Sequence, residues 1–387
     1  MNIFQHCRDP FVFSEYDFSV LPTQLINIGD YAFATNLQLS SVAFQENIET
    51  IGNCAFKNTS LKSAVFPLSL QTIGSDAFAI PTLENVQLGN KVSSIGDRCF
   101  AESKVRMFSV PTNCLSIGIY AFCGSRLETL SFNYPCSSDT IWDYSFANCS
   151  HLRTVYTNDN NIRTIGRSAF ECYEGLKEFT LGLKLETIKL NAFKHCTLLK
   201  DVIIPDDSCL SLIEALAFEG CVRLKNFKVS SENKNFSSED GVLYNKQKTE
   251  IVIYLPASNR TFFEIPSTVE RILAYAFQNA KNLEVVDIAS CKINSIGFKA
   301  FSGCSKLKKV LLPQFLSTID SLAFEQCPSM ECGSIVYNGS VPLGKLFVDS
   351  GIKLSALSPC PTIMFSVRAE LNDISSLWIM FEVTLDQ

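Results

Sequence analysis

The chain has 387 residues, of which 47% are hydrophobic and 19% are charged, and its formal net charge is −6 at pH 7. This balance excludes an intrinsically disordered chain, which would have too few apolar side chains to form a core. It also excludes a dedicated nucleic-acid binder, which would need a basic face. The 16 cysteines include no CxxC pair, so zinc knuckles and thioredoxin-like redox sites lack their required spacing.

Residues 1–20 precede the repeated part of the chain and are expected to form an N-terminal cap. Arg8, Asp9 and Pro10 interrupt the position where the apolar core of a signal peptide would lie. No apolar run approaches the length of about 18 residues that a membrane-spanning helix needs; the best candidate, LWIMF at 377–381, ends at Glu382. We therefore expect a soluble, unanchored chain.

Residues 21–331 contain twelve copies of one short pattern, an Ile followed five residues later by a Phe, with the consensus I-G-x-x-A-F, from Ile28 to Phe324. The Phe always follows the Ile by five residues, and the residue before it is Ala in ten copies. Consecutive Phe lie 22–25 residues apart, except for one gap of 59 between Phe218 and Phe277. Such a period indicates stacked units that share one core. We expect a buried spine of Phe side chains: Phe56, Phe78, Phe100, Phe122, Phe146, Phe170, Phe193 and Phe218.

Each unit also carries the pattern L-x-x-V-x-F, as in LENVQL (83–88) and LKKVLL (307–312). Its last two apolar positions are two apart, which is typical of one side of a strand, and a Pro often follows and ends the strand. The Gly of I-G permits either a bend or a close approach of two backbones. A-F-x-x-C has apolar positions three and four apart, which favours a helical or 3₁₀ turn. The fold class predicted is an α/β repeat solenoid of about 12 units, with a parallel β-sheet on one face and short helical or 3₁₀ turns on the other.

Five cysteines occupy one position of the repeat, eight residues after its Ile, where the other copies mostly carry small residues. We expect buried thiols there, because free Cys packs as a small hydrophobic side chain, and disulfides are the minority alternative. These residues are Cys149, Cys196, Cys221, Cys304 and Cys327.

The gap of 59 residues contains an insertion at about 233–256. Asp240-Gly241 is a turn signal, and GVLYN (241–245) and EIVIYL (250–255) flank KQKT, which predicts a projecting β-hairpin whose edges could pair with a partner strand.

Residues 332–387 are expected to form an irregular C-terminal cap. Within it, GSVPLGKL (339–346) nearly matches a phosphate-binding loop, but Leu346 stands where a hydroxyl must hold magnesium.

The chain offers little for catalysis. It has three His. His195 lies inside the repeat motif AFKHC, where we expect a packed or surface repeat position, and His6 and His151 have no patterned Asp or Cys beside them. The acidic pairs, such as Asp206-Asp207, are typical of solvated turns. We expect no enzyme activity, no catalytic or metal-binding residues and no cofactor.

Binding, by contrast, has a natural place on a solenoid, because the residues that point outward from the sheet vary between copies. One column of candidates is the outward residue between the last two apolar positions of L-x-x-V-x-F in each coil. A second column is the residue two positions earlier in the same strand. The candidates are Gln87, Met107, Ser109, Ser131, Tyr156, Thr180, Ile203 and Lys228.

The repeat resembles the leucine-rich repeat of the BspA-like family, on I-G-x-x-A-F, L-x-x-V-x-F-P, the Cys position and the insertion with its D-G-V-L-Y core. The resemblance implies a non-enzymatic protein-interaction module, a surface antigen or adhesin that binds host or cell-surface proteins through its sheet. The alternative is an intracellular scaffold of the same fold. The resemblance thus favours the cell surface, whereas the lack of a signal peptide and anchor favours the cytoplasm; the partner and the oligomeric state stay open.

Overall fold

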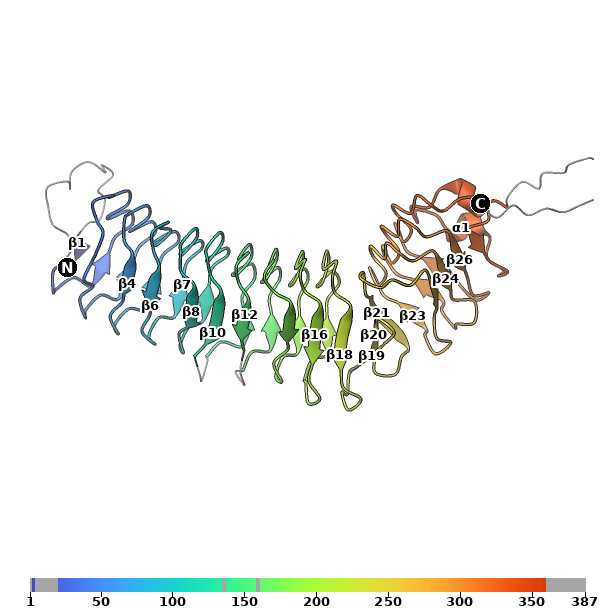
Figure 1. Cartoon of the computed structure of the whole chain (residues 1–387), viewed down its shortest axis with the longest axis horizontal. Helices are drawn as coiled ribbons and strands as arrows, with labels where there is room; N and C mark the ends of the chain where they lie inside the picture. Colours follow the sequence, from blue (N-terminus) through green and yellow to red (C-terminus); the bar gives the residue numbers. More distant parts are fainter. Residues whose placement is uncertain (1, 4–19, 134–136, 158–160, 360–387) are drawn as a thin grey trace, which may run out of the picture.

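A computed structural model describes residues 2–3, 20–133, 137–157 and 161–359. Most of the expected N-terminal cap and residues 360–387 of the expected C-terminal cap, including LWIMF, lie outside the described residues. The described chain is a curved solenoid whose coils follow one another along its long axis (Figure 1). It is built almost wholly from short parallel strands and contains almost no helix.

One side of the solenoid, the long-strand face, is made by the L-x-x-V-x-F segments. Here alternate residues point into the core, because successive side chains of a strand point to opposite faces; in β8, Phe108 and Val110 are buried and Met107 and Ser109 are exposed. The strands are β4 (Ser63–Val65), β6 (Asn85–Gln87), β8 (Met107–Val110), β10 (Thr129–Phe132), β12 (Thr154–Tyr156), β14 (Glu178–Thr180), β16 (Asp201–Ile204), β18 (Asn226–Val229), β22 (Phe262–Glu264), β24 (Val285–Asp287), β26 (Lys309–Leu311) and β28 (Ile335–Val336).

A second side, the short-strand face, is made by two-residue strands, which from β2 onward end on the Ile of the repeat. In these strands from β2 onward, the residue before the Ile is partly or fully exposed and the Ile is buried. The strands are β1 (Asn2–Ile3), β2 (Asn27–Ile28), β3 (Thr50–Ile51), β5 (Thr72–Ile73), β7 (Ser94–Ile95), β9 (Ser116–Ile117), β11 (Thr140–Ile141), β13 (Thr164–Ile165), β15 (Thr187–Ile188), β17 (Leu212–Ile213), β23 (Arg271–Ile272), β25 (Ser295–Ile296) and β27 (Thr318–Ile319).

The third side, the turn side, is where the structure corrects the sequence expectation. The A-F-x-x-C segments form neither α nor 3₁₀ helix. They form interlocked β-turns, such as Lys57 N–H to Cys54 carbonyl (3.1 Å) and Thr59 N–H to Phe56 carbonyl (3.2 Å). The residue two before each of the twelve Phe has a positive φ, between 51° and 62°. A left-handed residue breaks a right-handed helix, so apolar spacings of three and four arise here from turns.

The turns of successive coils are joined by a ladder of backbone hydrogen bonds. In the coil of Phe56, the N–H groups of Cys54, Phe56 and Asn58 donate to the carbonyls of Ser75, Ala77 and Ala79, at 2.8, 2.9 and 3.2 Å. The ladder therefore satisfies backbone groups that lie close to the core, as buried polar groups require.

The Phe side chains form a continuous column inside the solenoid. From Phe33 through Phe56, Phe78, Phe100, Phe122, Phe146, Phe170 and Phe193 to Phe218, neighbouring ring centroids are 5.0–6.1 Å apart and near parallel. A second column runs from Tyr254 through Phe277, Phe301 and Phe324 to Phe347. Within the described residues no ring pair joins Phe218 to Tyr254.

Glycine in I-G serves close approach rather than a bend. A Cβ on Gly74 would lie 2.6 Å from the backbone N of Asn53 and 2.6 Å from the backbone carbon of Gly52, in the coil before it. Contacts this short force one backbone to move, so the side chain must be absent for two coils to stack.

The insertion is built into the solenoid. This corrects the expectation that its β-hairpin would project from the repeats. The two predicted hairpin strands are present as β20 (Val242–Asn245) and β21 (Glu250–Tyr254), and β19 (Phe236–Glu239) pairs with β20 in front of them. β21 pairs in parallel with β23 of the next coil. β20 pairs with β19 on one side and with β21 on the other, and β21 also pairs with β23, so neither predicted hairpin strand is a free edge.

The C-terminal described residues close the stack. Helix α1 (Leu343–Leu346) and the 3₁₀ helix η1 (Leu354–Leu357) follow β28. Leu346, the residue that departs from the phosphate-binding pattern, is buried, and Phe347 continues the ring column beside Phe324 at 5.6 Å. This segment is core packing.

Candidate functional site

The long-strand face aligns the candidate residues in columns. Parallel pairing places Ser109 beside Ser131 and Ser131 beside Tyr156. In the next sheet along the chain it places Thr180 beside Ile203 and Ile203 beside Lys228. Met107 stands two residues before Ser109 and begins a column with Thr129 and Thr154. Gln87 lies apart from these, in the two-stranded sheet of β4 and β6.

The exposed side chains of this face mix apolar and polar groups. Met107 is 74% exposed and Tyr156 is 47% exposed, which leaves large apolar groups uncovered on the central sheet. Gln87, Ser109, Thr180 and Lys228 are also exposed, whereas Ser131 and Ile203 are half-buried. Large exposed side chains of this kind are the ones that protein interfaces favour.

Polar contacts run across the strands of the same face. The hydroxyls of Ser109 and Ser131 are 2.7 Å apart. The Lys228 ammonium lies 2.9 Å from a carboxylate oxygen of Glu178 and 3.7 Å from one of Asp201. Because Lys228 and Glu178 are each half exposed, this pairing fixes the side chains in place more than it stabilises the fold.

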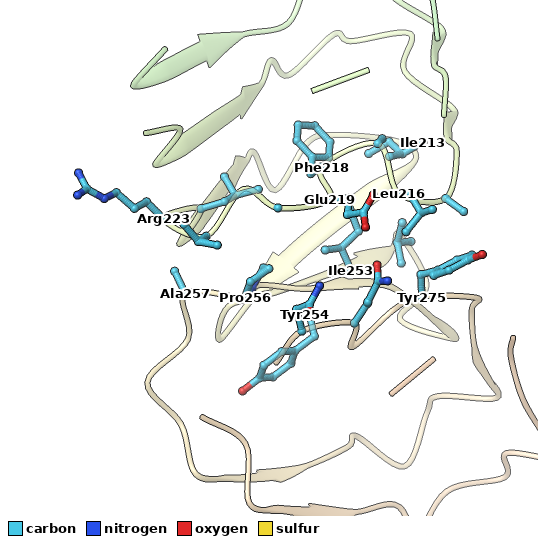
Figure 2. Close-up of a pocket in the computed structure, with 18 of the residues that line it drawn as sticks. Ile213, Leu216, Phe218, Glu219, Arg223, Ile253, Tyr254, Pro256, Ala257 and Tyr275 are labelled. Atoms are coloured by element: carbon cyan, nitrogen blue, oxygen red, sulfur yellow. The ribbon is translucent and has the colours of Figure 1, made fainter. Parts of the chain in front are cut away.

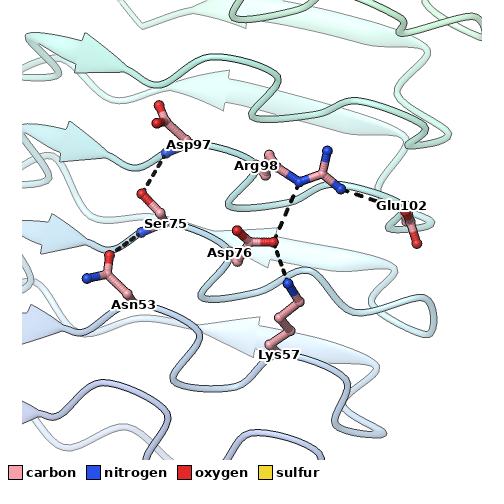
Figure 3. Close-up of polar contacts among 7 residues, drawn as sticks. All are labelled: Asn53, Lys57, Ser75, Asp76, Asp97, Arg98 and Glu102. Atoms are coloured by element: carbon pink, nitrogen blue, oxygen red, sulfur yellow. Dashed lines mark hydrogen bonds and ion pairs between the residues drawn. The ribbon is translucent and has the colours of Figure 1, made fainter.

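On the edge between the short-strand face and the turn side, polar side chains link coils one after another (Figure 3). The Asn53 side-chain oxygen accepts the Ser75 N–H at 2.8 Å, and the Ser75 hydroxyl accepts the Asp97 N–H at 3.2 Å. Asp76 lies 2.8 Å from the Lys57 ammonium and 3.6 Å from the Arg98 guanidinium. These contacts join neighbouring coils, so we assign them to the scaffold.

The repeated cysteines are part of the core. The thiols of Cys149, Cys221 and Cys304 donate to the carbonyls of Phe122, Phe193 and Phe277 in the preceding coil, at 3.4, 3.1 and 3.2 Å. Burial raises the pKa of the Cys149 thiol far above its ordinary value, so the thiolate needed for nucleophilic chemistry is disfavoured. All five cysteines of this position are free thiols, while Cys332 is disulfide-bonded.

The described part of the chain offers no metal site and no membrane span. No group of three or more His, Cys, Asp or Glu is placed to hold a metal ion among these residues. In the same ranges, no helix combines the length and apolar character that crossing a bilayer requires.

Sequence reasoning missed a cavity of about 1200 Å³ on the turn side, between the coil of Phe218 and the coil of Phe277. Figure 2 shows Phe218, Leu216 and Glu219 on one side of it and Ile253, Tyr254 and Pro256 on the other. The cavity lies where the ring column is interrupted, because the chain between β21 and β22 passes directly to the long-strand face without an A-F turn. The 59-residue gap between Phe218 and Phe277 was its only signal in the sequence.

Comparison with known proteins identifies the repeat. A model of the BspA-type leucine-rich repeat region, in six copies, matches residues 9–128, 116–248 and 256–343. No curated protein sequence matches the chain.

Solved structures of bacterial leucine-rich repeat proteins are similar to the chain. A leucine-rich repeat protein from Bacteroides ovatus is 20% identical over 83% of this chain and 91% of its own, with a TM-score of 0.53. A leucine-rich cell surface protein from Faecalibacterium prausnitzii is 20% identical over 86% of this chain and 90% of its own, with a TM-score of 0.44. The pneumococcal vaccine antigen PcpA is 20% identical over 82% of this chain and 67% of its own, with a TM-score of 0.37. At these identities the likeness to the first of them concerns the fold alone.

Proposed function

This chain belongs to the BspA-type leucine-rich repeat family, and from that premise we propose that it is a non-enzymatic module that binds a protein partner through its long-strand face. The observation that supports the proposal most is the alignment of Met107, Ser109, Ser131 and Tyr156 on three paired strands. Met107 and Tyr156 leave apolar surface in water, and burying such surface drives association. Ser109 and Ser131 supply the polar groups that set orientation.

The family resemblance directs this proposal to partners displayed on cell surfaces, in the manner of an adhesin. A second candidate, an intracellular scaffold with the same binding face, is favoured by the free thiols at the repeated position, Cys149, Cys196, Cys221, Cys304 and Cys327, because reducing compartments preserve thiols. Labelling the protein on intact and on permeabilised cells separates the two; a signal confined to permeabilised cells excludes the adhesin.

Binding to intact cultured cells tests the role of the face. We expect the purified, fluorescently labelled chain to bind in a manner that trypsin treatment of the cells abolishes. The variant M107S/Y156S should lower the affinity by about tenfold or more, since well-packed apolar anchors each contribute over about 1 kcal/mol.

The matched control is L37S/L115S, which removes two Leu side chains that are 69% and 63% exposed and lie off the long-strand face. This control should bind like the unmodified chain. Equal loss of binding in the two variants, or full binding by M107S/Y156S, would refute the assignment of the face.

A further inference from the structure

The wall of the cavity formed by the Phe218 coil carries three backbone donors without acceptors. In the other coils, two or all three of the N–H groups two before, at and two after the Phe donate to the next coil; those of Tyr144, Phe146 and Asn148 do so at 2.8, 3.1 and 2.8 Å. The equivalent groups here belong to Leu216, Phe218 and Gly220, and all three residues line the cavity. Their N–H groups donate no hydrogen bond to any described residue.

The opposite wall carries the matching acceptors. The coil of Phe277 presents the carbonyls of Ala274, Ala276 and Gln278, at the positions that accept the ladder in other coils. Tyr254 N–H donates to Ala276 at 2.7 Å. The carbonyls of Ala274 and Gln278 accept no hydrogen bond from the residues that the structure describes, and both residues line the cavity. Donors on one wall thus face acceptors on the other across the space of an incomplete coil.

The charges around the cavity are unequal. Lys200, Arg223, Lys225 and Lys281 line it, are exposed, and form no ion pair within the described ranges. The two acidic side chains of the lining are already engaged: Glu214 accepts the Leu190 N–H at 2.8 Å, and Glu219 pairs with Lys194 at 3.2 Å. An acidic ligand fits this balance.

We propose that this cavity binds a short acidic peptide segment of a partner protein, which completes the missing turn of the solenoid. Each residue of a peptide carries one backbone N–H and one carbonyl. The peptide carbonyls accept from the N–H groups of Leu216, Phe218 and Gly220, and its N–H groups donate to the carbonyls of Ala274 and Gln278. An apolar side chain of the peptide enters between Phe218 and Tyr254. The volume of about 1200 Å³ exceeds the 300–1,000 Å³ typical of a pocket for a drug-sized molecule. The site is separate from the long-strand face.

Hydrogen exchange of the full chain, read at the backbone amides of Leu216, Phe218 and Gly220, tests this inference with a defined probe. The probe is a fluorescein-labelled heptapeptide of alternating Glu and Leu, compared with a heptapeptide of alternating Lys and Leu. In the free chain these three amides should exchange faster than the equivalent amides of Tyr144, Phe146 and Asn148. The Glu/Leu peptide should slow them by about tenfold or more, because hydrogen-bonded amides exchange only on opening; the Lys/Leu peptide should not.

Two double variants of equal charge change test the role of the cations. K225E/K281E should weaken binding of the Glu/Leu peptide by about tenfold, the effect of losing about 1.4 kcal/mol, whereas K62E/K91E, away from the cavity, should leave it unchanged. The variant A257W, which fills the cavity, should abolish binding. Absence of binding, or binding that leaves the three amides fast, overturns the proposal. Slow exchange in the free chain also overturns it, because the chain itself would then occupy the cavity. None of these outcomes depends on M107S/Y156S, so the two sites fail or stand separately.

Discussion

Removing one ring from the Phe column gives a sharp test of the stacked solenoid. Phe146 is fully buried, and its ring stacks on Phe122 at 5.6 Å and on Phe170 at 6.0 Å, with interplanar angles of 15° and 18°. F146A removes a large buried side chain from between two coils that cannot close without moving the backbone ladder. Emptying such a site costs about 3–5 kcal/mol, and part of that is the loss of two aromatic pairs at about 0.5–1.5 kcal/mol each.

Urea unfolding followed by circular dichroism measures this cost as a shift of the midpoint at unchanged slope. F315A is the matched control, because Phe315 is 69% exposed, and it should change the free energy of unfolding by less than about 0.5 kcal/mol. A cost below about 1 kcal/mol for F146A, or equal costs for the two variants, would refute the stacked column at this position.

G74A should destabilise the fold by about 1–3 kcal/mol through overpacking, since its Cβ would lie 2.6 Å from backbone atoms of the preceding coil. G344A, whose Cβ meets nothing within 4 Å, should not lower the melting temperature; equal melting temperatures for both variants would contradict the close stacking. Ellman's reagent should label the exposed Cys209 in the folded chain and the buried Cys149 and Cys304 only after unfolding, so labelling of the latter two in the folded chain would disprove their burial. The free energy of unfolding should fall as pH rises above about 8.5, the ordinary pKa of a thiol. Burial raises the pKa of the Cys99 and Cys149 thiols, so above that pH the unfolded chain loses protons that the folded chain keeps. C149A should weaken this pH dependence in urea unfolding, and an unchanged profile would contradict it.

The sequence was sufficient to locate those elements whose residues recur at a fixed spacing because they are buried. The Ile and Phe of I-G-x-x-A-F recur because one buried row must stack on the next, so spacing alone located them. The long strands followed from alternation, and the hairpin strands β20 and β21 followed from the turn signal at Asp240-Gly241. In each case the structural requirement, burial of an apolar side chain or a tight turn, restricts the residue types at the position and is therefore visible in the sequence.

The turn side could not be predicted in the same way. Of the twelve left-handed residues two before the Phe, only Asn191 is the Gly or Asn that usually marks such a backbone, and the others include Tyr31 and Cys54. The neighbouring coil imposes the conformation through the backbone ladder, and apolar spacings of three and four then imitate a helix. The cavity could not be predicted for a related reason. It arises where an A-F turn is absent, and an absent turn has no residues whose pattern could indicate it.

We expect partners to contact the residues that vary between coils on the long-strand face. Hydrogen exchange of the chain bound to the trypsin-sensitive cell-surface protein, compared with the free chain, tests this most directly. We predict slower exchange in segments 107–110, 129–132 and 154–156 and no change in the A-F turns of the same coils. Protection confined to those turns, with the long strands unaffected, would contradict the account.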